Sequence, residues 1–206
     1  MSVESAVAKK PPRQTVAAAV SAIIHPVALP LLTLVVVTYT TPGGSLQRSL
    51  LLAVVALLLT TAPVAALVGY QVARGRWTDL DVSVREQRYL LYPIGLVCAA
   101  VMIAVFVAMH APAPAMVTAL AMALANTVDG VINLAYKVSA HTTTAAVCAT
   151  LLWLYSPGWG LPAAIAAALV GWSRVELGRH TTGQVILGWT VGISSALAVF
   201  FLYNAA

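Results

Sequence analysis

The sequence predicts an all-α protein, a multi-pass transmembrane helical bundle of about six to seven spans. Of its 206 residues, 61% are hydrophobic and only 8% are charged, whereas a soluble domain carries about 25% charged residues. The mean hydropathy is +0.92. The apolar residues also fall into runs, and a helix needs roughly 20 of them to cross about 30 Å of hydrocarbon. These observations place the chain in a bilayer.

Seven apolar runs predict the spans in chain order: Val16–Thr38, Leu50–Gln71, Leu90–Met109, Pro114–Tyr136, Ala140–Leu154, Leu161–Trp172 and Val185–Tyr203. The fifth and sixth runs are short, and we expect them to form a helical hairpin that turns at Ser156-Pro157-Gly158. His25-Pro26, with Pro30 one turn later, predicts a kink in the first run.

The first run lacks a small-residue cleavage site after a short apolar core, so we expect it to be a retained span. Residues 1–15 are expected to form a basic tail, and residues 16–206 a single membrane-embedded domain. Cys98 and Cys148 both lie in apolar runs without metal-ligand spacing, which indicates core packing.

Basic residues predict the orientation of the bundle. If the spans alternate strictly, all but one of the 11 lysines and arginines lie on one side. That side holds Lys9, Lys10, Arg13, Arg74, Arg76, Arg85, Arg88, Lys137, Arg174 and Arg179, and the other holds Arg48. The positive-inside rule makes the basic side cytoplasmic, in a plasma (inner) membrane. Cations confined to short loops do not indicate nucleic-acid binding, so no nucleic-acid partner is expected.

Three polar clusters lie on this basic side. They are Trp77–Arg88, which ends where the third run begins, Lys137–His141 at the junction of the fourth and fifth runs, and Ser173–Gln184 before the seventh. Because hydropathy alone places all three clusters at one membrane face, the helices could bring them together.

The third cluster carries the most specific pattern. Ser173-Arg174 is followed after five residues by His180, and this spacing resembles the third signature of the type 2 phosphatidic acid phosphatase superfamily. The usual signature ends in Asp four residues after the His. Gln184 stands there in this chain, as in the dolichyl diphosphatase branch.

The other two clusters resemble the remaining signatures less closely. Lys137–His141 is similar to Pro-Ser-Gly-His, with Val138 and Ala140 replacing Pro and Gly while Ser139 and His141 keep their places. The first signature, Lys, six residues, Arg-Pro, is matched loosely. Arg88 keeps its place, but Asp81 stands at the lysine position and Tyr89 replaces the proline. The family core usually has six spans, so a seventh is another departure.

The resemblance implies a role for each of these residues. His180 would be the nucleophile that forms a phosphohistidine, and His141 would transfer protons. Gln184 would fix the tautomer of His180. The resemblance implies no metal and no cofactor. The substrate phosphate would be bound by Arg88, Arg85, Lys137, Ser139, Ser173 and Arg174. Arg85, Arg88 and Lys137 could equally be interfacial anchors.

A row of polar residues lies inside the fourth run. Asn126, Asp129, Asn133 and Lys137 are spaced three, four and four residues apart, so they share one helix face. One reading is a polar wall beneath the site, formed by Asp129 and Asn133, with Asp129 paired to an arginine or to Lys137. The other is hydrogen bonding between neighbouring helices.

We therefore expect a metal-independent membrane phosphatase acting on a lipid phosphate. Gln184 favours polyprenyl (isoprenoid) phosphates or diphosphates, while phosphatidic acid and phosphatidylglycerophosphate also fit. Two other classes remain open. One is a catalytically inactive membrane scaffold that binds lipid phosphate, and the other is a small anion transporter. The oligomeric state is not predicted.

Overall fold

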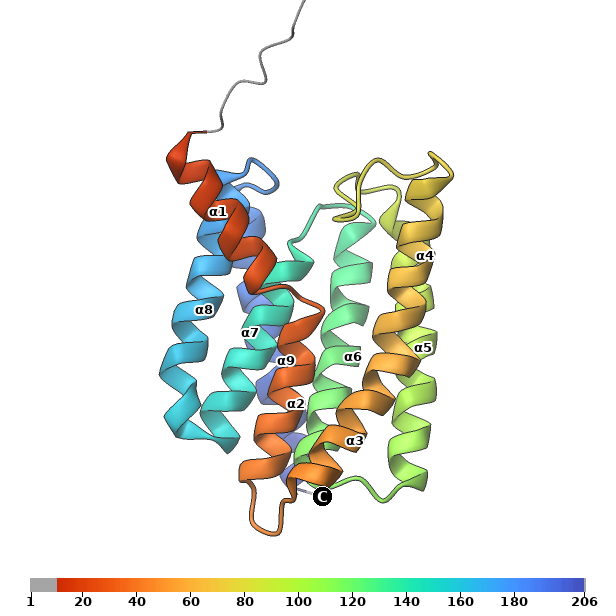
Figure 1. Ribbon diagram of the computed structural model, residues 1–206, viewed down its shortest axis with the longest axis vertical. Helices are drawn as coiled ribbons and strands as arrows, with labels where there is room; N and C mark the ends of the chain where they lie inside the picture. The colour runs from red at the N-terminus through yellow and green to blue at the C-terminus, as the bar shows by residue number, and fades with distance from the viewer. Residues whose placement is uncertain (1–10, 206) are drawn as a thin grey trace, which may run out of the picture.

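The computed structural model describes residues 11–205 and consists of helices in this range, without strands. The elements are α1 (Pro12–Ile23), α2 (Ala28–Thr40), α3 (Leu46–Ala56), the π-helical turn η1 (Leu57–Thr61), α4 (Ala62–Ala73), α5 (Arg88–Ala108), α6 (Ala113–Asn133), α7 (Ala140–Tyr155), α8 (Pro157–Glu176) and α9 (Thr182–Ala205). Most of them run along the long axis of the molecule (Figure 1). The all-α prediction is confirmed.

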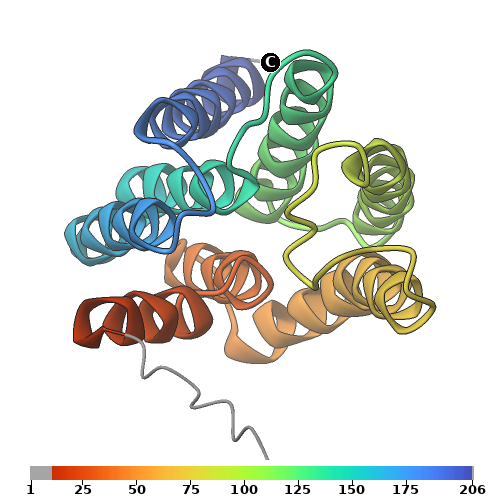
Figure 2. The same cartoon turned by 90° about the horizontal axis from the view of Figure 1, so that it is seen from above.

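Helix α7 lies inside the bundle. It packs against α8, α9, α2 and α6, while α5 packs against α6 and the α3–η1–α4 segment. Figure 2 shows α7 and α6 between α9 on one side and α2 with α3 on the other. Two buried clusters fill the interior, one around Phe106 and Leu52 and one around Val147 and Leu151. The inner helix therefore sets the positions of its neighbours.

Prolines explain the two irregularities in the amino-terminal half. The chain bends by 50° between α1 and α2, where Pro26 lacks an amide hydrogen and cannot continue the helical ladder. The predicted kink is thereby confirmed. Pro63, near the start of α4, removes another ladder donor directly after η1, and a π turn accommodates such a gap.

Four helical segments are long and apolar enough to cross a membrane: Leu46–Ala73, α5, α6 and α9. The bent pair α1–α2 would make a fifth span. A count of six to seven is therefore not confirmed. Helix α7 has only 16 residues, fewer than a single apolar span needs. Helix α8 has 20 residues, but its glycines, prolines and terminal Ser173 and Arg174 make it less apolar.

Large apolar side chains cover the outside of the bundle. Val97, Ile165, Phe201 and Leu202 are each more than half exposed, although they lie within helices. A lipid-facing surface accounts for such exposure, because hydrocarbon tails solvate apolar side chains. The outer surface therefore fits a protein embedded in a membrane.

Charged residues gather at one end of the bundle, as the alternation of the apolar runs predicts. The α4–α5 and α6–α7 loops and the carboxyl end of α8 lie together at that end (Figure 1). Arg13 of α1 forms an ion pair with Glu176 of α8 there. Arg48 lies at the opposite end, where its guanidinium bonds to the carbonyl oxygen of His110. Lys9 and Lys10 fall outside the described residues, and α1 begins at Pro12, inside the expected tail.

Small residues let α9 approach the start of α7 closely. A Cβ atom added at Gly188 would collide with Thr142 and lie 2.9 Å from the Ser139 carbonyl oxygen. One turn later, a Cβ at Gly192 would lie 2.7 Å from the Ala146 side chain. Both contacts are shorter than real Cβ contacts, so only glycine allows this spacing. The α7–α9 approach therefore depends on Gly188 and Gly192.

Substituting Gly188→Ala tests this packing. The added methyl group must displace the α7 backbone, so we expect destabilisation of about 1–3 kcal/mol, typical of overpacking. The measurement is the thermal unfolding temperature in detergent. Gly69→Ala is the matched control, since nothing lies within 4 Å of its added Cβ and alanine favours helix by up to about 1 kcal/mol. Equal stability of the two variants would contradict the argument.

Candidate functional site

The structure brings the three polar clusters together at one end of the bundle. Arg88 of the first cluster donates from Nη1 to the Val138 carbonyl oxygen of the second, at 2.9 Å. Lys137 of the second donates from Nζ to the Arg179 carbonyl oxygen of the third, also at 2.9 Å. Arg174 of the third bonds back to the first cluster. Each cluster therefore contacts the other two.

A glycine turn places His180 in this site. Helix α8 ends at Glu176, and Gly178 follows with a φ of +64°, a conformation that glycine adopts without a Cβ penalty. The chain then folds back, so that the amides of Arg179 and His180 both donate to the Arg174 carbonyl oxygen. His180 is thereby fixed over the end of α8 and is only 6% exposed.

Gln184 holds the His180 ring and caps α9 at once. Its Oε1 lies 3.0 Å from His180 Nδ1 and also accepts from the Thr181 amide. The main-chain N–H of Gln184 in turn donates to the Thr181 hydroxyl, which completes a capping box. Because Oε1 can only accept, Nδ1 carries the ring proton and the Nε2 lone pair stays free. The glutamine at position 184 therefore also has a structural role, because it caps the start of α9.

Arg174 is the most buried charged residue of the site, at 1% exposed. Its Nη1 donates to Asp81 Oδ2 and to Ser21 Oγ, each at 3.0 Å. Its Nε is buried and has no hydrogen-bond partner. A buried guanidinium needs an anion close by, and Asp81 supplies one. Arg174 Nε is therefore free to donate to a further acceptor.

Arg88 is also buried and is held by backbone oxygens. Its Nε donates at 2.7 Å to the carbonyl oxygen of Val82, a residue with a φ of +47°. Such a φ is strained for a β-branched side chain, and burial of Val82 against Val68 and Trp77 holds it in place. The strained turn thus directs a carbonyl at Arg88 and fixes a cation in the site.

Ser139 and His141 begin α7 and offer free polar atoms. Ser139 Oγ and His141 Nε2 are both buried without a hydrogen-bond partner. His141 Nε2 lies 3.9 Å from Asp81 Oδ1, too far for a hydrogen bond. The start of a helix also attracts anions through its free amides. Ser139 Oγ, His141 Nε2 and Arg174 Nε are therefore three buried polar atoms of the clusters without a hydrogen-bond partner.

The other predicted phosphate ligands are occupied elsewhere. Arg85 Nη1 donates to the carbonyl oxygens of Leu134 and Ala135 at the end of α6. Ser173 is fully buried, and its hydroxyl donates to the Val170 carbonyl oxygen within α8. Lys137 reaches the third cluster through Arg179. Of these three residues, only Lys137 hydrogen-bonds to a neighbour of His180 in sequence, the carbonyl oxygen of Arg179.

Asp129 does not pair as expected. Within residues 11–205 it makes no ion pair with an arginine or with Lys137, and its Oδ1 instead accepts from the Thr143 hydroxyl at 3.1 Å. The physical reason is the direction of the α6 face, which turns towards α7. Asn133 donates from Nδ2 to the Arg85 carbonyl oxygen. Both residues thus hydrogen-bond to neighbouring segments.

The collected cations shift the titration of the loop residues. Burial, followed by the charges of Arg88 and Lys137, lowers the pKa of His180 to about 3, while the hydrogen bond to Gln184 opposes them. Burial, with Arg88, Arg174 and Arg179, also lowers the pKa of the Lys137 ammonium. Partial burial acts to raise the pKa of Asp81, but Arg174 and His141 outweigh it and hold that pKa below its ordinary range. At neutral pH His180 is therefore an uncharged imidazole.

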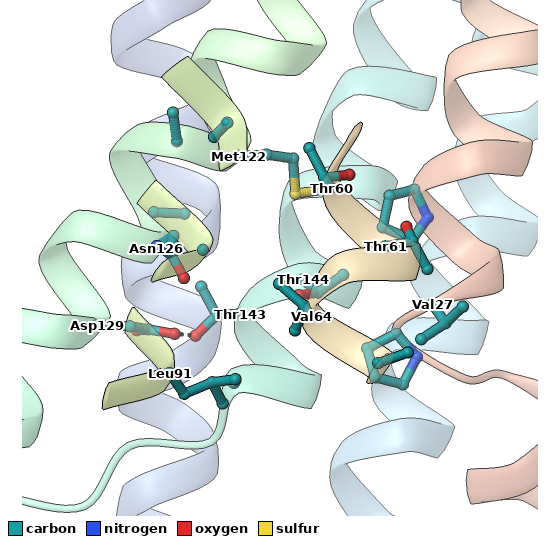
Figure 3. Close-up of a pocket in the computed structure, with 18 of the residues that line it drawn as sticks. Val27, Thr60, Thr61, Val64, Leu91, Met122, Asn126, Asp129, Thr143 and Thr144 are labelled. Atoms are coloured by element: carbon teal, nitrogen blue, oxygen red, sulfur yellow. Dashed lines mark hydrogen bonds between the residues drawn. The ribbon is translucent and has the colours of Figure 1, made fainter. Parts of the chain in front are cut away.

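A cavity of about 550 Å³ opens from the site into the bundle. Asp81, Arg88 and His141 line one end, and Met102 and Phe106 line it further along α5. Arg88 and Phe106 are 18 residues apart, or about 27 Å along a helix. Figure 3 shows Asn126 and Asp129 on one side of the cavity, with Thr143 bonded to Asp129. The cavity is long for its volume and mostly apolar.

Sequence reasoning missed three neighbours of the site. Ser21 bonds to Arg174, and Thr143 bonds to Asp129. The His25 ring lies in edge contact with His141, with centroids 5.8 Å apart, although the sequence indicated only a kink there. A histidine inside an apolar run is the one signal that could have pointed to His25. Nothing in the sequence distinguishes Ser21 from other helical serines.

Comparison with known proteins agrees with this part of the chain. Residues 129–206 match the family model described as PAP2 superfamily, the type 2 phosphatidic acid phosphatases. The match contains the second and third clusters and leaves out the first. No curated protein and no solved structure matches the chain. The predicted resemblance is confirmed.

The depressed pKa of His180 predicts its titration. An ordinary histidine protonates near pH 6.5, but we expect the His180 ring to stay neutral from about pH 8 to pH 5. The unfolded chain would bind a proton there that the folded chain does not. The stability that His180 contributes is therefore full above about pH 6.5 and is lost as the pH falls towards 3.

Histidine NMR in detergent measures this. The His180 ring signals are assigned by their absence in His180→Asn. A His180 midpoint near pH 6.5, the ordinary value for histidine, would contradict the geometry.

Proposed function

We propose that this chain, whose residues 129–206 match the PAP2 superfamily model, is an integral membrane enzyme that hydrolyses a lipid phosphate. The substrate is a phosphomonoester or diphosphate of a lipid alcohol, and polyprenyl phosphates are favoured. One observation carries the proposal. A neutral His180 with its Nδ1 proton held by Gln184 lies in a site with buried Arg88 and Arg174.

The chemistry follows from the free atoms of the site. His180 Nε2 attacks phosphorus and the bond from phosphorus to the lipid oxygen breaks, which leaves a phosphohistidine. His141 begins the cycle protonated on Nε2 and gives this proton to the leaving oxygen, which leaves it as a neutral base. Water then attacks the phosphohistidine while His141 takes its proton, and inorganic phosphate leaves with His180 restored. Each proton is thereby accounted for, and no metal takes part.

Cations and unpaired donors would stabilise the charge on the transferred group. Arg174 Nε and Ser139 Oγ each lack a partner, and a phosphate oxygen is an acceptor for both. Arg88 and Lys137 add positive charge close to His180. Such fixed donors act on the equatorial oxygens as the transition state forms. Asp81 competes with the substrate for Arg174, so phosphate must replace or share that contact.

The cavity supports a chain-like lipid. It begins beside Asp81, Arg88 and His141 and continues past Gly95 towards Phe106. A mainly apolar space that extends along α5 suits a hydrocarbon chain better than a bulky headgroup. Together with Gln184, this shape favours an isoprenoid alcohol as the leaving group.

The membrane arrangement in this proposal uses every helical segment. Helices α7 and α8 cross the bilayer together with Leu46–Ala73, α5, α6, α9 and the bent pair α1–α2. The inner position of α7 lets it be shorter and more polar than a lipid-exposed helix. The basic end, and with it the site, faces the cytoplasm of a plasma-membrane protein.

Phosphate release from a panel of lipid phosphates tests the reaction. In detergent with chelator present, we expect release by the intact protein and a loss of more than about 10³-fold in His180→Ala, because the nucleophile is gone. Gln184→Asp should stay active, since a carboxylate also accepts from Nδ1. His110→Ala is the matched control and should release phosphate normally. No release from any lipid, even with Gln184→Asp, would favour the inactive lipid-binding scaffold.

A second substitution tests the cavity. A Cβ atom at Gly95 meets only the Asn126 side chain, at 3.5 Å or more, so Gly95→Leu would narrow the cavity without a backbone clash. We expect the ratio of long-chain to short-chain polyprenyl phosphate turnover to fall by roughly 10-fold. Gly69→Leu, which adds bulk in open space on α4, should leave the ratio unchanged. An unchanged ratio in Gly95→Leu would exclude the cavity as the chain-binding site.

A further inference from the structure

Three metal-ligating side chains meet beside the phosphate site. His25 lies in the break between α1 and α2, Asp81 in the α4–α5 loop and His141 in the first turn of α7. One ligand atom from each lies within 4.8 Å of the other two. The two histidine rings are in edge contact, 5.8 Å apart. Segments more than 50 residues apart in sequence thus place two imidazoles and one carboxylate together.

Two of these groups have a free ligand atom. His141 Nε2 is buried and makes no hydrogen bond, and its side chain is only 11% exposed. Asp81 uses Oδ2 for Arg174 and directs Oδ1 towards His141, at 3.9 Å. A buried imidazole nitrogen without a partner is costly. A cation between His141 Nε2 and Asp81 Oδ1 would satisfy both atoms without breaking the bond to Arg174.

His25 must give up one weak contact to act as a ligand. Its Nδ1 accepts from the Val27 amide at 3.2 Å, which places the ring proton on Nε2. Binding through Nε2 moves this proton to Nδ1, and binding through Nδ1 competes with the amide directly. The contact is long and exposed, so its loss costs little compared with a metal–nitrogen bond.

The ligand atoms must also move closer. Two ligands about 2.0–2.1 Å from a tetrahedral metal ion stand roughly 3.3 Å apart, less than the 4.8 Å limit found here. His25 lies in a helix break and Asp81 in a loop, where no helical ladder holds the backbone. His141 belongs to the inner helix and would stay in place. The two peripheral ligands can therefore close on the buried one.

We propose that His25, Asp81 and His141 form a site for one divalent transition-metal ion such as zinc. Two imidazoles and one carboxylate are the donors that this class of ion prefers, and a fourth position stays open for water. Arg174 adds a nearby positive charge, and its bond to Asp81 Oδ2 leaves the opposite carboxylate oxygen for the ion. The Asp81 carboxylate lies between the two cations.

Occupation of this site has a consequence that depends on the proposed function. A metal bound to His141 Nε2 occupies the lone pair that would take and give the proton. The ion would therefore inhibit phosphate release although the reaction needs no metal. His25 has no part in the proposed chemistry, so its loss should remove inhibition and leave turnover intact.

Direct binding tests the site without reference to activity. Zinc is titrated calorimetrically into the detergent-solubilised full chain, freed of any histidine tag, and cobalt(II) spectra report the coordination. We expect one ion per chain and affinity weakened by more than roughly 100-fold in His25→Ala, since loss of an outer partner alone costs 10–100-fold. Asp81→Asn should weaken binding similarly, after a check of its folding. His110→Ala is the control histidine and should bind normally.

Inhibition provides the second measurement. Zinc should abolish phosphate release by the wild type reversibly with chelator, and His25→Ala should release phosphate in its presence. His180→Ala, which has lost activity, should still bind zinc as the wild type does. This variant separates the two proposals, because metal binding can succeed when catalysis fails. Stoichiometric binding that survives both His25→Ala and Asp81→Asn, or no binding at all, would overturn the proposed metal site.

Discussion

The site depends on the contact between Arg174 and Asp81. Arg174 is almost fully buried, and a guanidinium cannot stay charged in such a place without an anion and hydrogen-bond acceptors. Asp81 provides the charge and Ser21 a second acceptor. These two bonds tie α8, the α4–α5 loop and α1 together at one end of the bundle. Removing either charged partner of a buried pair typically costs about 3–5 kcal/mol, so the packing of this end depends on the pair.

The same pair explains how an acidic residue can stand in the proposed phosphate site. Asp81 takes up only one donor of Arg174 and leaves Nε without a partner, while Arg88 is held by carbonyl oxygens that carry no charge. The positive field therefore exceeds what Asp81 neutralises. It is strong enough, together with burial, to keep His180 uncharged. A neutral imidazole beside several cations is what a nucleophile for an anionic substrate requires.

Local patterns in the sequence predicted more of the fold than of the site. Hydropathy and proline placement depend on neighbouring residues, so the apolar runs, the break at His25-Pro26 and the shared end of the three clusters agree with the structure. The count of six to seven spans is not confirmed, because α7 is shorter, and α8 less apolar, than a lipid-facing span needs. The contacts of Asp129 with Thr143 and of Ser21 with Arg174 depend on which helices pack together. The spacing of polar residues along one helix shows which of them share a face, but not which residues of another helix that face will contact.

His141 links the features of this site. Its ring lines the chain-sized cavity, faces Asp81 and contacts His25. In the two proposals, a side chain in that position would contact both the lipid chain and the cation beside Asp81. A metal ion there would lie at the mouth of the cavity and would block proton transfer and approach of the substrate together. The proposed ion and the proposed substrate would therefore compete, because both need His141 Nε2.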